Sequence, residues 1–329
     1  MAAVRGGGIL PGVDAGGVRR VDGRTRVGLV GVGAIARTHL EVLAERSEVD
    51  LVFTVDPRAE PPMFRGATPA HHRDLDDALA AHRPHLVVVA TPADSHADLA
   101  AAVLTGSDAR VLVEKPLAPD PASVDRLRGV AGSHGRLFTA HHFAFSPEVR
   151  WAADLVAAHP EWGPVTAVTS AFNDPYVLKG EQAFTSYLSA WTDSGINQLT
   201  VLARLVRVDE VTSLRDERTS CWAVASFRSR GAVGEARLHT SWRTGASSKS
   251  TAFTCGDVEV WLDHTAMTGF AFRGGELLAE HGGDGRTPRK VAHYRPLYAS
   301  LLSDRPDPIL GLAAAASLTD LHATAGRRS

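Results

Sequence analysis

The feature that most constrains the fold is the stretch Arg26–Arg58, in which two apolar runs flank a glycine-rich turn and a helical pattern. The first run, residues 27–30, is apolar throughout, as a strand buried on both faces requires. A G-x-G-x-x-A motif follows at once, at Gly31, Gly33 and Ala36. The second run ends in Asp56, at a separation close to the roughly 20 residues expected of a dinucleotide-binding βαβ unit. We therefore predict such a unit here.

Each small residue of this motif has a physical role. Gly31 allows a tight turn, Gly33 leaves room for a pyrophosphate, and Ala36 lets the helix pack closely on the strand. The helix begins at Ala34 and Ile35, and its first N–H groups carry a partial positive charge toward the phosphates.

The acidic residue predicts the kind of nicotinamide cofactor. Asp56 can accept hydrogen bonds from both ribose hydroxyls, and its charge repels a 2′-phosphate, which favours NAD. Arg58 follows two residues later and leaves NADP open.

The length and composition of the chain limit its number of domains and its possible partners. A chain of 329 residues exceeds one small core, so we expect two domains. The net charge of −2 gives no reason to expect nucleic acid or an anionic membrane as a partner, and no apolar run reaches the length of a membrane span. The two cysteines, Cys221 and Cys255, are too few for a thiolate metal site, so we predict no metal and a cytoplasmic protein. Residues 1–24 read as a flexible N-terminal tail.

Buried strands alternate with helical patterns through the first half. The apolar runs 86–90, 110–113 and 137–140 are separated by helical stretches, which predicts a doubly wound parallel sheet over residues 25–145. Loops at the carboxyl ends of such strands hold the ligand contacts. Four polar residues fall at such ends: Asp56, Thr91, Lys115 and His142.

The pattern changes in residues 146–329. Four segments alternate with period two, as antiparallel strands with one covered face do: 164–172, 221–227, 232–242 and 251–262. A helix at 195–205 lies between the first of them and the rest. We predict a substrate-binding α+β domain with an open, mostly antiparallel sheet, whose uncovered face pairs with another subunit.

Lys115 and Asp193 are the candidates for chemistry. An ammonium at Lys115, next to Pro116, would hydrogen-bond a substrate hydroxyl and ease its deprotonation; the alternative is a surface lysine before a turn. Asp193 and Asn197 are four residues apart at a helix start and so share one side of it. Asp193 would accept a proton and Asn197 would orient the substrate, whereas the alternative is a helix N-cap at Asp193.

Other polar side chains have weaker signals. His142 would donate a hydrogen bond to a polar substrate, or pack at the domain junction. His96 is expected to be structural or near the cofactor. Trp242 and Arg243 close a strand and would border the pocket; the alternative is an edge aromatic without a role in the pocket.

Several motifs together resemble the glucose–fructose oxidoreductase / inositol dehydrogenase (Gfo/Idh/MocA) family. They are VGVGAIA, the strand-end TPADSH, EKP at Glu114–Pro116, and the helix start that contains Asp193. The resemblance covers roughly residues 25–325. It implies a Rossmann domain with bound NAD(P), a second domain on an open sheet, a sugar or cyclitol substrate, and a homodimer or homotetramer joined through that sheet. It also implies that Lys115 contacts the reacting hydroxyl, and that Thr91, Pro92 and Glu114 line the nicotinamide.

One position departs from the family pattern. Asn197 stands where most members carry the histidine of a D-x-x-x-H motif, and an asparagine relays no proton. The D-x-G-I-N variant is similar to the sugar 1-dehydrogenases that oxidise L-arabinose or D-galactose to a lactone. This resemblance implies oxidation of an aldose at C1. Two alternatives stay open: a ketosugar reductase or cyclitol dehydrogenase, and a regulator that senses NAD(P) without catalysis. Because the second half shows no basic cluster along its sequence, a free sugar is preferred.

Overall fold

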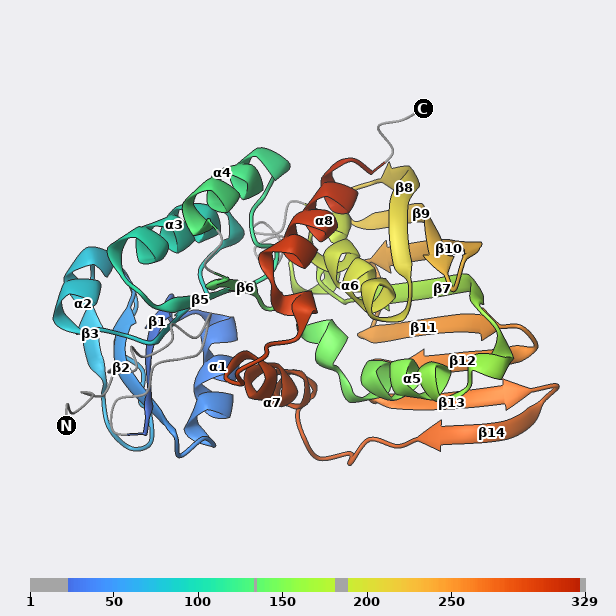
Figure 1. Cartoon of the computed structure of the whole chain (residues 1–329), viewed down its shortest axis with the longest axis horizontal. Coiled ribbons are helices and arrows are strands. Elements are labelled where there is room, and N and C mark those ends of the chain that lie inside the picture. The colour runs from blue at the N-terminus through green and yellow to red at the C-terminus, as the bar shows by residue number, and fades with distance from the viewer. Residues whose placement is uncertain (1–22, 133–134, 181–188, 326–329) are drawn as a thin grey trace, which may run out of the picture.

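The computed structural model describes residues 23–132, 135–180 and 189–325, which form two β-sheets side by side. The first sheet lies in the N-terminal half of the chain and the second in the C-terminal half (Figure 1). Residues 1–22 of the predicted N-terminal tail lie outside the described residues. The two-part fold, an α/β Rossmann sheet followed by a mostly antiparallel α+β sheet, is the one predicted from the sequence.

The first sheet has six parallel strands in the order β3-β2-β1-β4-β5-β6. Their bounds are β1 Thr25–Val30, β2 Val49–Val55, β3 Ala70–His72, β4 Leu86–Val89, β5 Arg110–Val113 and β6 Leu137–Thr139. The apolar runs become the central strands because both of their faces are covered, and every residue of β4 and β5 is buried. The order in which strands are added to the sheet reverses between β1 and β4, although the strands stay parallel. This switch point places a crevice at the carboxyl ends of β1 and β4.

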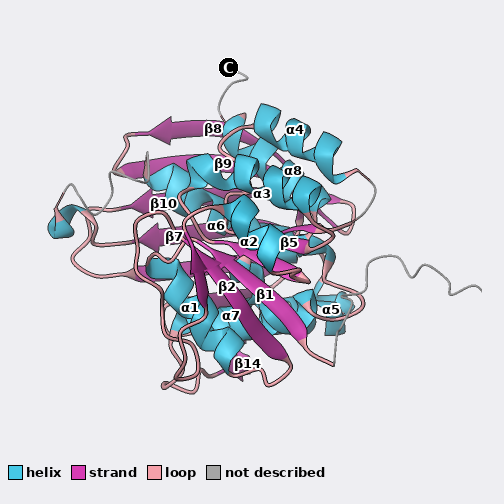
Figure 2. Ribbon diagram, turned by 90° about the vertical axis from the view of Figure 1, so that its left-hand side faces the viewer, coloured by secondary structure: helices cyan, strands magenta, loops and turns pink. Residues whose placement is uncertain are grey.

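Helices cover both faces of this sheet (Figure 2). Helices α2 (Leu75–Ala81), α3 (His96–Gly106) and α4 (Pro121–Ala131) bury one face, and α1 (Ala34–Ala44) packs on the other. Helix α7 (Arg289–Leu301) lies beside α1 and buries Tyr294, Leu297 and Tyr298 against it. The division of the chain into two domains at residue 146 stays a prediction. It assigned α7 to the second domain, whereas α7 packs on the first sheet.

The second sheet has eight strands in the order β14-β13-β12-β11-β7-β10-β9-β8. Only the β7–β10 pair is parallel. The bounds are β7 Val165–Asn173, β8 Arg207–Asp216, β9 Ser220–Ser229, β10 Ala232–Ser241, β11 Ser248–Cys255, β12 Val258–Asp263, β13 Thr268–Arg273 and β14 Glu276–His281.

The sequence prediction was wrong at one of these segments. Residues 251–262 were expected to form one strand, but they form most of the β11–β12 hairpin. Gly256, with a φ of +57°, occupies the turn, a conformation that L side chains rarely adopt. The prediction also missed β3, β8, β13 and β14, whose alternation is interrupted by exposed polar residues.

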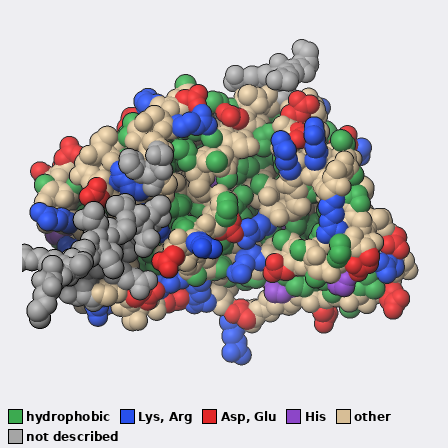
Figure 3. Space-filling view, viewed as in Figure 1, with side chains coloured by type: hydrophobic (Ala, Val, Ile, Leu, Met, Phe, Trp, Pro, Cys, Tyr) green, Lys and Arg blue, Asp and Glu red, His purple; other side chains and the backbone are tan. Residues whose placement is uncertain are grey.

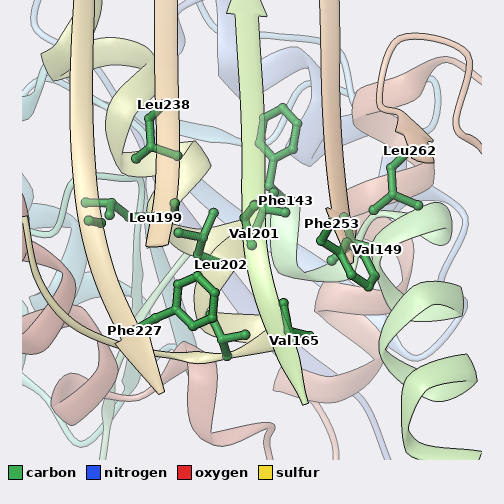
Figure 4. Close-up of a cluster of buried hydrophobic side chains, with 14 of the residues drawn as sticks. Phe143, Val149, Val165, Leu199, Val201, Leu202, Phe227, Leu238, Phe253 and Leu262 are labelled. Atoms are coloured by element: carbon green, nitrogen blue, oxygen red, sulfur yellow. The ribbon is translucent and has the colours of Figure 1, made fainter. Parts of the chain in front are cut away.

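Three helices bury one face of the second sheet: α5 (Pro147–Ala158), α6 (Ile196–Leu205) and α8 (Leu312–Ala323). Figure 4 shows this core, in which Phe143, Val149 and Leu199 face Phe227 and Phe253 from the strands. The other face keeps large apolar side chains exposed, among them Trp222 and Trp261. The sheet is therefore covered by helices on one side only.

The charge on one face and the length of the helices can be described directly. On the face drawn in Figure 3, acidic and basic side chains are mixed. Within the described residues, no helix combines the length and the apolar character needed to cross a bilayer.

Candidate active site

The glycine turn has the geometry that the motif predicts. Gly31 has a φ of +88°, and a Cβ added there would lie 2.7 Å from the carbonyl oxygen of Ala90. Gly33 stands at the N-cap of α1 with nothing within 4 Å of an added Cβ, and no side chain caps the helix. Ala36 is fully buried against the sheet. The first N–H groups of α1, starting at Ala34 and Ile35, therefore face open space into which a diphosphate fits.

Asp56 is held beside this turn. Its Oδ2 accepts a hydrogen bond from the Val32 N–H at 3.0 Å, and its Oδ1 accepts from the N–H groups of Arg58 and Ala59 at 2.9 Å each. Partial burial raises the pKa of the Asp56 carboxyl, but these backbone donors outweigh burial, so its pKa lies below the usual range. The carboxylate is thus charged and fixed at the tip of β2, while the Arg58 side chain is exposed.

His96 joins the two loops that follow β4 and β5. It is buried, and its ring nitrogens lie 2.7 Å from the carbonyl oxygen of Pro116 and 2.8 Å from that of Thr91. Thr91 and Pro92 therefore stand at a fixed distance from Lys115. His96 thus makes a structural contact between the two loops, and a structural role is one of the two predicted for it.

Lys115 and Asp193 meet in space. The Lys115 Nζ donates to Asp193 Oδ1 at 3.0 Å and to the Asp193 carbonyl oxygen at 3.1 Å, and the two side chains are 16 % and 11 % exposed. Asn197 Nδ2 donates to the same carbonyl at 3.1 Å. Asp193 lies inside a π-helical turn, Trp191–Gly195, and helix α6 has Gly195 at its N-cap, so Asp193 does not cap this helix. The lysine, acid and amide predicted from the sequence thus form one group.

Glu114 has partners that the sequence analysis missed. It is buried, and its Oε1 accepts from His39 Nε2 at 2.9 Å and from the Tyr294 hydroxyl. The ring of His39 also contacts the Tyr298 hydroxyl at 2.7 Å. Burial raises the pKa of Glu114, but the bonds from His39 and Tyr294 reverse this effect and lower it. The carboxylate thus ties the end of β5 to α1 and α7, and its role beside the nicotinamide stays a prediction.

His142 also has a partner that the sequence analysis missed. The chain turns into a 3₁₀ helix, His142–Phe145, and His142 Nδ1 lies 3.1 Å from Nδ1 of His293 on α7. The His142 ring also stacks on Tyr294, with centroids 5.2 Å apart. Burial lowers the pKa of His142 well below its usual value and that of His293 to about 3, so both rings are neutral near pH 7. Neutral imidazoles donate or accept one hydrogen bond per nitrogen, which suits contact with a hydroxyl.

Comparisons with known proteins agree with this geometry. Residues 25–142 match the model of the oxidoreductase family with an NAD-binding Rossmann fold, GFO_IDH_MocA. This domain belongs to the Gfo/Idh/MocA oxidoreductases. Inositol 2-dehydrogenase of Rhizobium meliloti (strain 1021) is 30 % identical over 155 residues, which is 46 % of this chain and 46 % of the relative. The match thus spans about half the length of this curated relative.

Solved structures share the fold over most of this chain. GenD2 from gentamicin A biosynthesis, in complex with NAD, has a TM-score of 0.71 at 23 % identity and covers 98 % of this chain and 97 % of its own. KijD10, a 3-ketoreductase from Actinomadura kijaniata in complex with NADP and TDP-benzene, has a TM-score of 0.72 at 18 % identity and covers 92 % of this chain and 97 % of its own. At these identities the likeness shows the fold. The prediction of a nicotinamide cofactor is confirmed at the level of the family, whose Rossmann fold binds NAD.

Two residues proposed for the substrate pocket contact other residues than Lys115 and Asp193. Trp242 is buried against Ala190 and Tyr176, with the Trp242 and Tyr176 rings 5.6 Å apart. Arg243 is exposed, and its Nε donates to Thr219 Oγ1 at 2.7 Å, in the turn between β8 and β9. Their roles toward a substrate stay predictions. As for a metal, the described residues contain no group of three or more His, Cys, Asp or Glu side chains arranged to hold one.

A second lysine–aspartate pair escaped the sequence analysis. The Lys249 Nζ donates to Asp174 Oδ1 at 2.5 Å, with side-chain exposures of 5 % and 13 %. Burial lowers the pKa of Lys249 and is opposed by Asp174. No motif surrounds either residue, and only the pairing of β7 with β11 brings them together.

Proposed function

We propose that the protein is an NAD(P)-dependent oxidoreductase that oxidises a sugar at a CH–OH group, with an aldose oxidised at C1 to its lactone. The observation that carries this proposal is the contact of Lys115 with Asp193 and of Asn197 with the same residue, beside the carboxyl ends of the Rossmann strands.

Each residue has a step in this reaction. Lys115 donates a hydrogen bond to the C1 hydroxyl and stabilises the negative charge that develops on its oxygen. Asp193 accepts the hydroxyl proton as the C1=O bond forms. A nicotinamide bound at the glycine turn would supply the acceptor for the hydride that C1 loses. Asn197 and the neutral His142 orient the sugar.

The choice of the anomeric carbon follows from the base. An anomeric hydroxyl is more acidic than a ring hydroxyl, so a carboxylate suffices to take its proton. Asn197 offers no proton relay at the position where a histidine is usual in the family. A carboxylate base without an imidazole therefore favours C1 over a ring carbon.

Two relatives favour a second candidate. One is named an inositol 2-dehydrogenase and another a 3-ketoreductase, so oxidation of a cyclitol or reduction of a ketosugar at a ring carbon is the alternative for this chain.

A spectrophotometric screen for reduced nicotinamide tests both candidates. It pairs NAD⁺ and NADP⁺ with D-galactose, L-arabinose, D-glucose, D-xylose and inositols. Reduced cofactor together with a lactone product from an aldose supports the proposal. Turnover of inositols alone supports the second candidate. Cofactor binding without turnover of any of them contradicts oxidation of these aldoses and inositols, and favours a ketosugar reductase or a regulator.

A further inference from the structure

Helix α7 has two positively charged residues at its N-terminus. Its first two residues are Arg289 and Lys290, its N-cap is Pro288 without a side-chain cap, and its first turn holds no acidic residue. The N-terminus of a helix carries a partial positive charge, so two cations there are unfavourable. Such an arrangement favours an anion at this helix end.

The guanidinium of Arg289 lacks a hydrogen-bond partner for its Nη1, which is buried. It lies over the Phe143 ring at 5.6 Å. Two acids have charges that act on it, but neither bonds to it within the described residues: Asp174 bonds to Lys249 at 2.5 Å, and Glu148 bonds to His264 at 2.7 Å through Oε1. A buried N–H without an acceptor is destabilising, more so on a charged group, and an incoming anion removes this cost.

This helix end borders the candidate active site. Phe143, whose ring lies under the Arg289 guanidinium, directly follows His142 in the sequence. It packs on Phe172 with ring centroids 5.0 Å apart. The Lys249 Nζ lies 5.9 Å from the centroid of the Phe172 ring, the second ring of this Phe143–Phe172 pair. The pKa of His142 is lowered mainly by burial and by the His293 ring, and the positive charges of Lys115, Arg289 and Lys290 lower it further.

We propose that Arg289 and Lys290, at the first turn of α7, bind an anionic group of the substrate, a carboxylate or a phosphate. This inference rests on the proposed function and narrows its substrate class to acidic sugars. A guanidinium fork matches both groups bidentately. The sequence alone favoured a free sugar because its basic residues are not clustered along the chain; the fold gathers Lys115, Lys249 and the start of α7 from three separate segments.

Kinetics with matched sugars test the substrate class. The wild type and Arg289→Gln are compared on D-galacturonate, D-galactose 6-phosphate and D-galactose with NAD⁺. We expect the wild type to prefer one of the acidic sugars, and Arg289→Gln to reduce the ratio of kcat/KM for acidic over neutral sugar by about 10- to 100-fold. The exposed Arg286, three residues before, supplies the control Arg286→Gln, which keeps the wild-type ratio. Carboxylate and phosphate are distinguished by which acidic sugar is preferred.

Direct binding separates this inference from the proposed reaction. Malonate and inorganic phosphate are titrated calorimetrically into the full chain saturated with NAD⁺, so that the glycine turn is occupied. Binding that Arg289→Gln or Lys290→Gln weakens and Arg286→Gln does not supports the anion site even where no sugar is turned over. Lys290 is exposed, so its variant tests the site where Arg289→Gln fails to fold. Equal anion binding in all four proteins, or a wild-type preference for the neutral sugar, overturns the inference.

Discussion

The Lys115 ammonium lies 3.0 Å from the Asp193 carboxylate, although 78 residues separate them. One stands at a carboxyl end of the Rossmann sheet and the other in the turn before α6. The contact joins the two halves of the chain at one point. Any reaction that needs a cation and a base near the nicotinamide has both here.

Replacing Lys115 should therefore affect turnover far more than cofactor binding. We expect Lys115→Ala to lower kcat by about 10²–10⁴-fold, as loss of a positioned acid–base group does. The dissociation constant for NAD⁺, measured by fluorescence titration, should change little. Lys115→Arg keeps the charge and tests whether position matters. Full turnover in Lys115→Ala would contradict the role given to this lysine.

The two glycines of the turn should respond differently to one methyl group. Gly31→Ala should destabilise the fold by about 1–3 kcal/mol or more, because its φ of +88° is strained for alanine and the Cβ meets the Ala90 carbonyl at 2.7 Å. Gly33→Ala should leave stability near the wild type, since its Cβ meets nothing within 4 Å, but weaken NAD⁺ binding by blocking the diphosphate. Urea denaturation and NAD⁺ titration of both variants check this, and normal NAD⁺ binding by Gly33→Ala would contradict it.

Patterns local in sequence predicted much of this molecule. The period of the apolar residues fixes which strands are buried on both faces, and the spacing of Gly31, Gly33 and Asp56 fixes the turn between them. Lys115 and Asp193 were found because each belongs to a recognisable motif. Their contact was not predictable from spacing alone.

The missed features depend on contacts between distant segments. The His39–Glu114 hydrogen bond joins residues 75 positions apart in the sequence. The motif around Glu114 predicts where its backbone lies but not which side chains it contacts. His293 and Arg289 lie on a helix whose sequence resembles any amphipathic segment. The packing of this helix against α1 and against the 3₁₀ helix His142–Phe145 brings them to the site.

Asp56 should set the choice between NAD and NADP. Asp56→Asn removes the charge that repels a 2′-phosphate while keeping the side-chain shape. We expect the preference for NAD⁺ over NADP⁺ to fall by about 10-fold or more, measured as the ratio of kcat/KM values or of dissociation constants. Arg58→Gln, at an exposed side chain of the same loop, is the control and should move the ratio toward NAD⁺. An unchanged ratio in Asp56→Asn would rule out this role.

His141 should make stability fall in acid. Burial lowers the pKa of His141 from 6.5 to about 4, partly opposed by its bond to the Ile309 carbonyl. Between these values the unfolded chain binds a proton that the folded chain does not. The free energy of unfolding is therefore highest above about pH 6.5 and decreases by about 1.4 kcal/mol per pH unit from this group as the pH falls toward 4.

Urea denaturation at several pH values measures this slope. His141→Gln keeps an N–H donor for the Ile309 carbonyl but does not titrate. Its stability should decrease less steeply than that of the wild type below about pH 6. Parallel curves for the two proteins would show that His141 takes up its proton in the folded state.

The uncovered face of the eight-stranded sheet should join two copies of the chain, as we propose from its exposed aromatic residues. Trp222 on β9 and Trp261 on β12 are 45 % and 55 % exposed on that face, with three strands between them, and Trp261 pairs across the strands with Phe270. Large apolar side chains that gather on one exposed face are costly to leave in water. A second copy would cover it by presenting the same face.

Sedimentation velocity of a double variant, Trp222→Glu with Trp261→Glu, tests this pairing. We expect the wild type to sediment as a dimer or tetramer and the variant to shift toward the monomer, because burying two carboxylates in an apolar interface costs several kcal/mol. NAD⁺ binding should persist, since the substitutions lie on the other sheet. Met63→Glu, at a residue 62 % exposed in the Rossmann half, should leave the assembly unchanged. A wild type that sediments as a monomer would mean that the aromatic face has another partner or none.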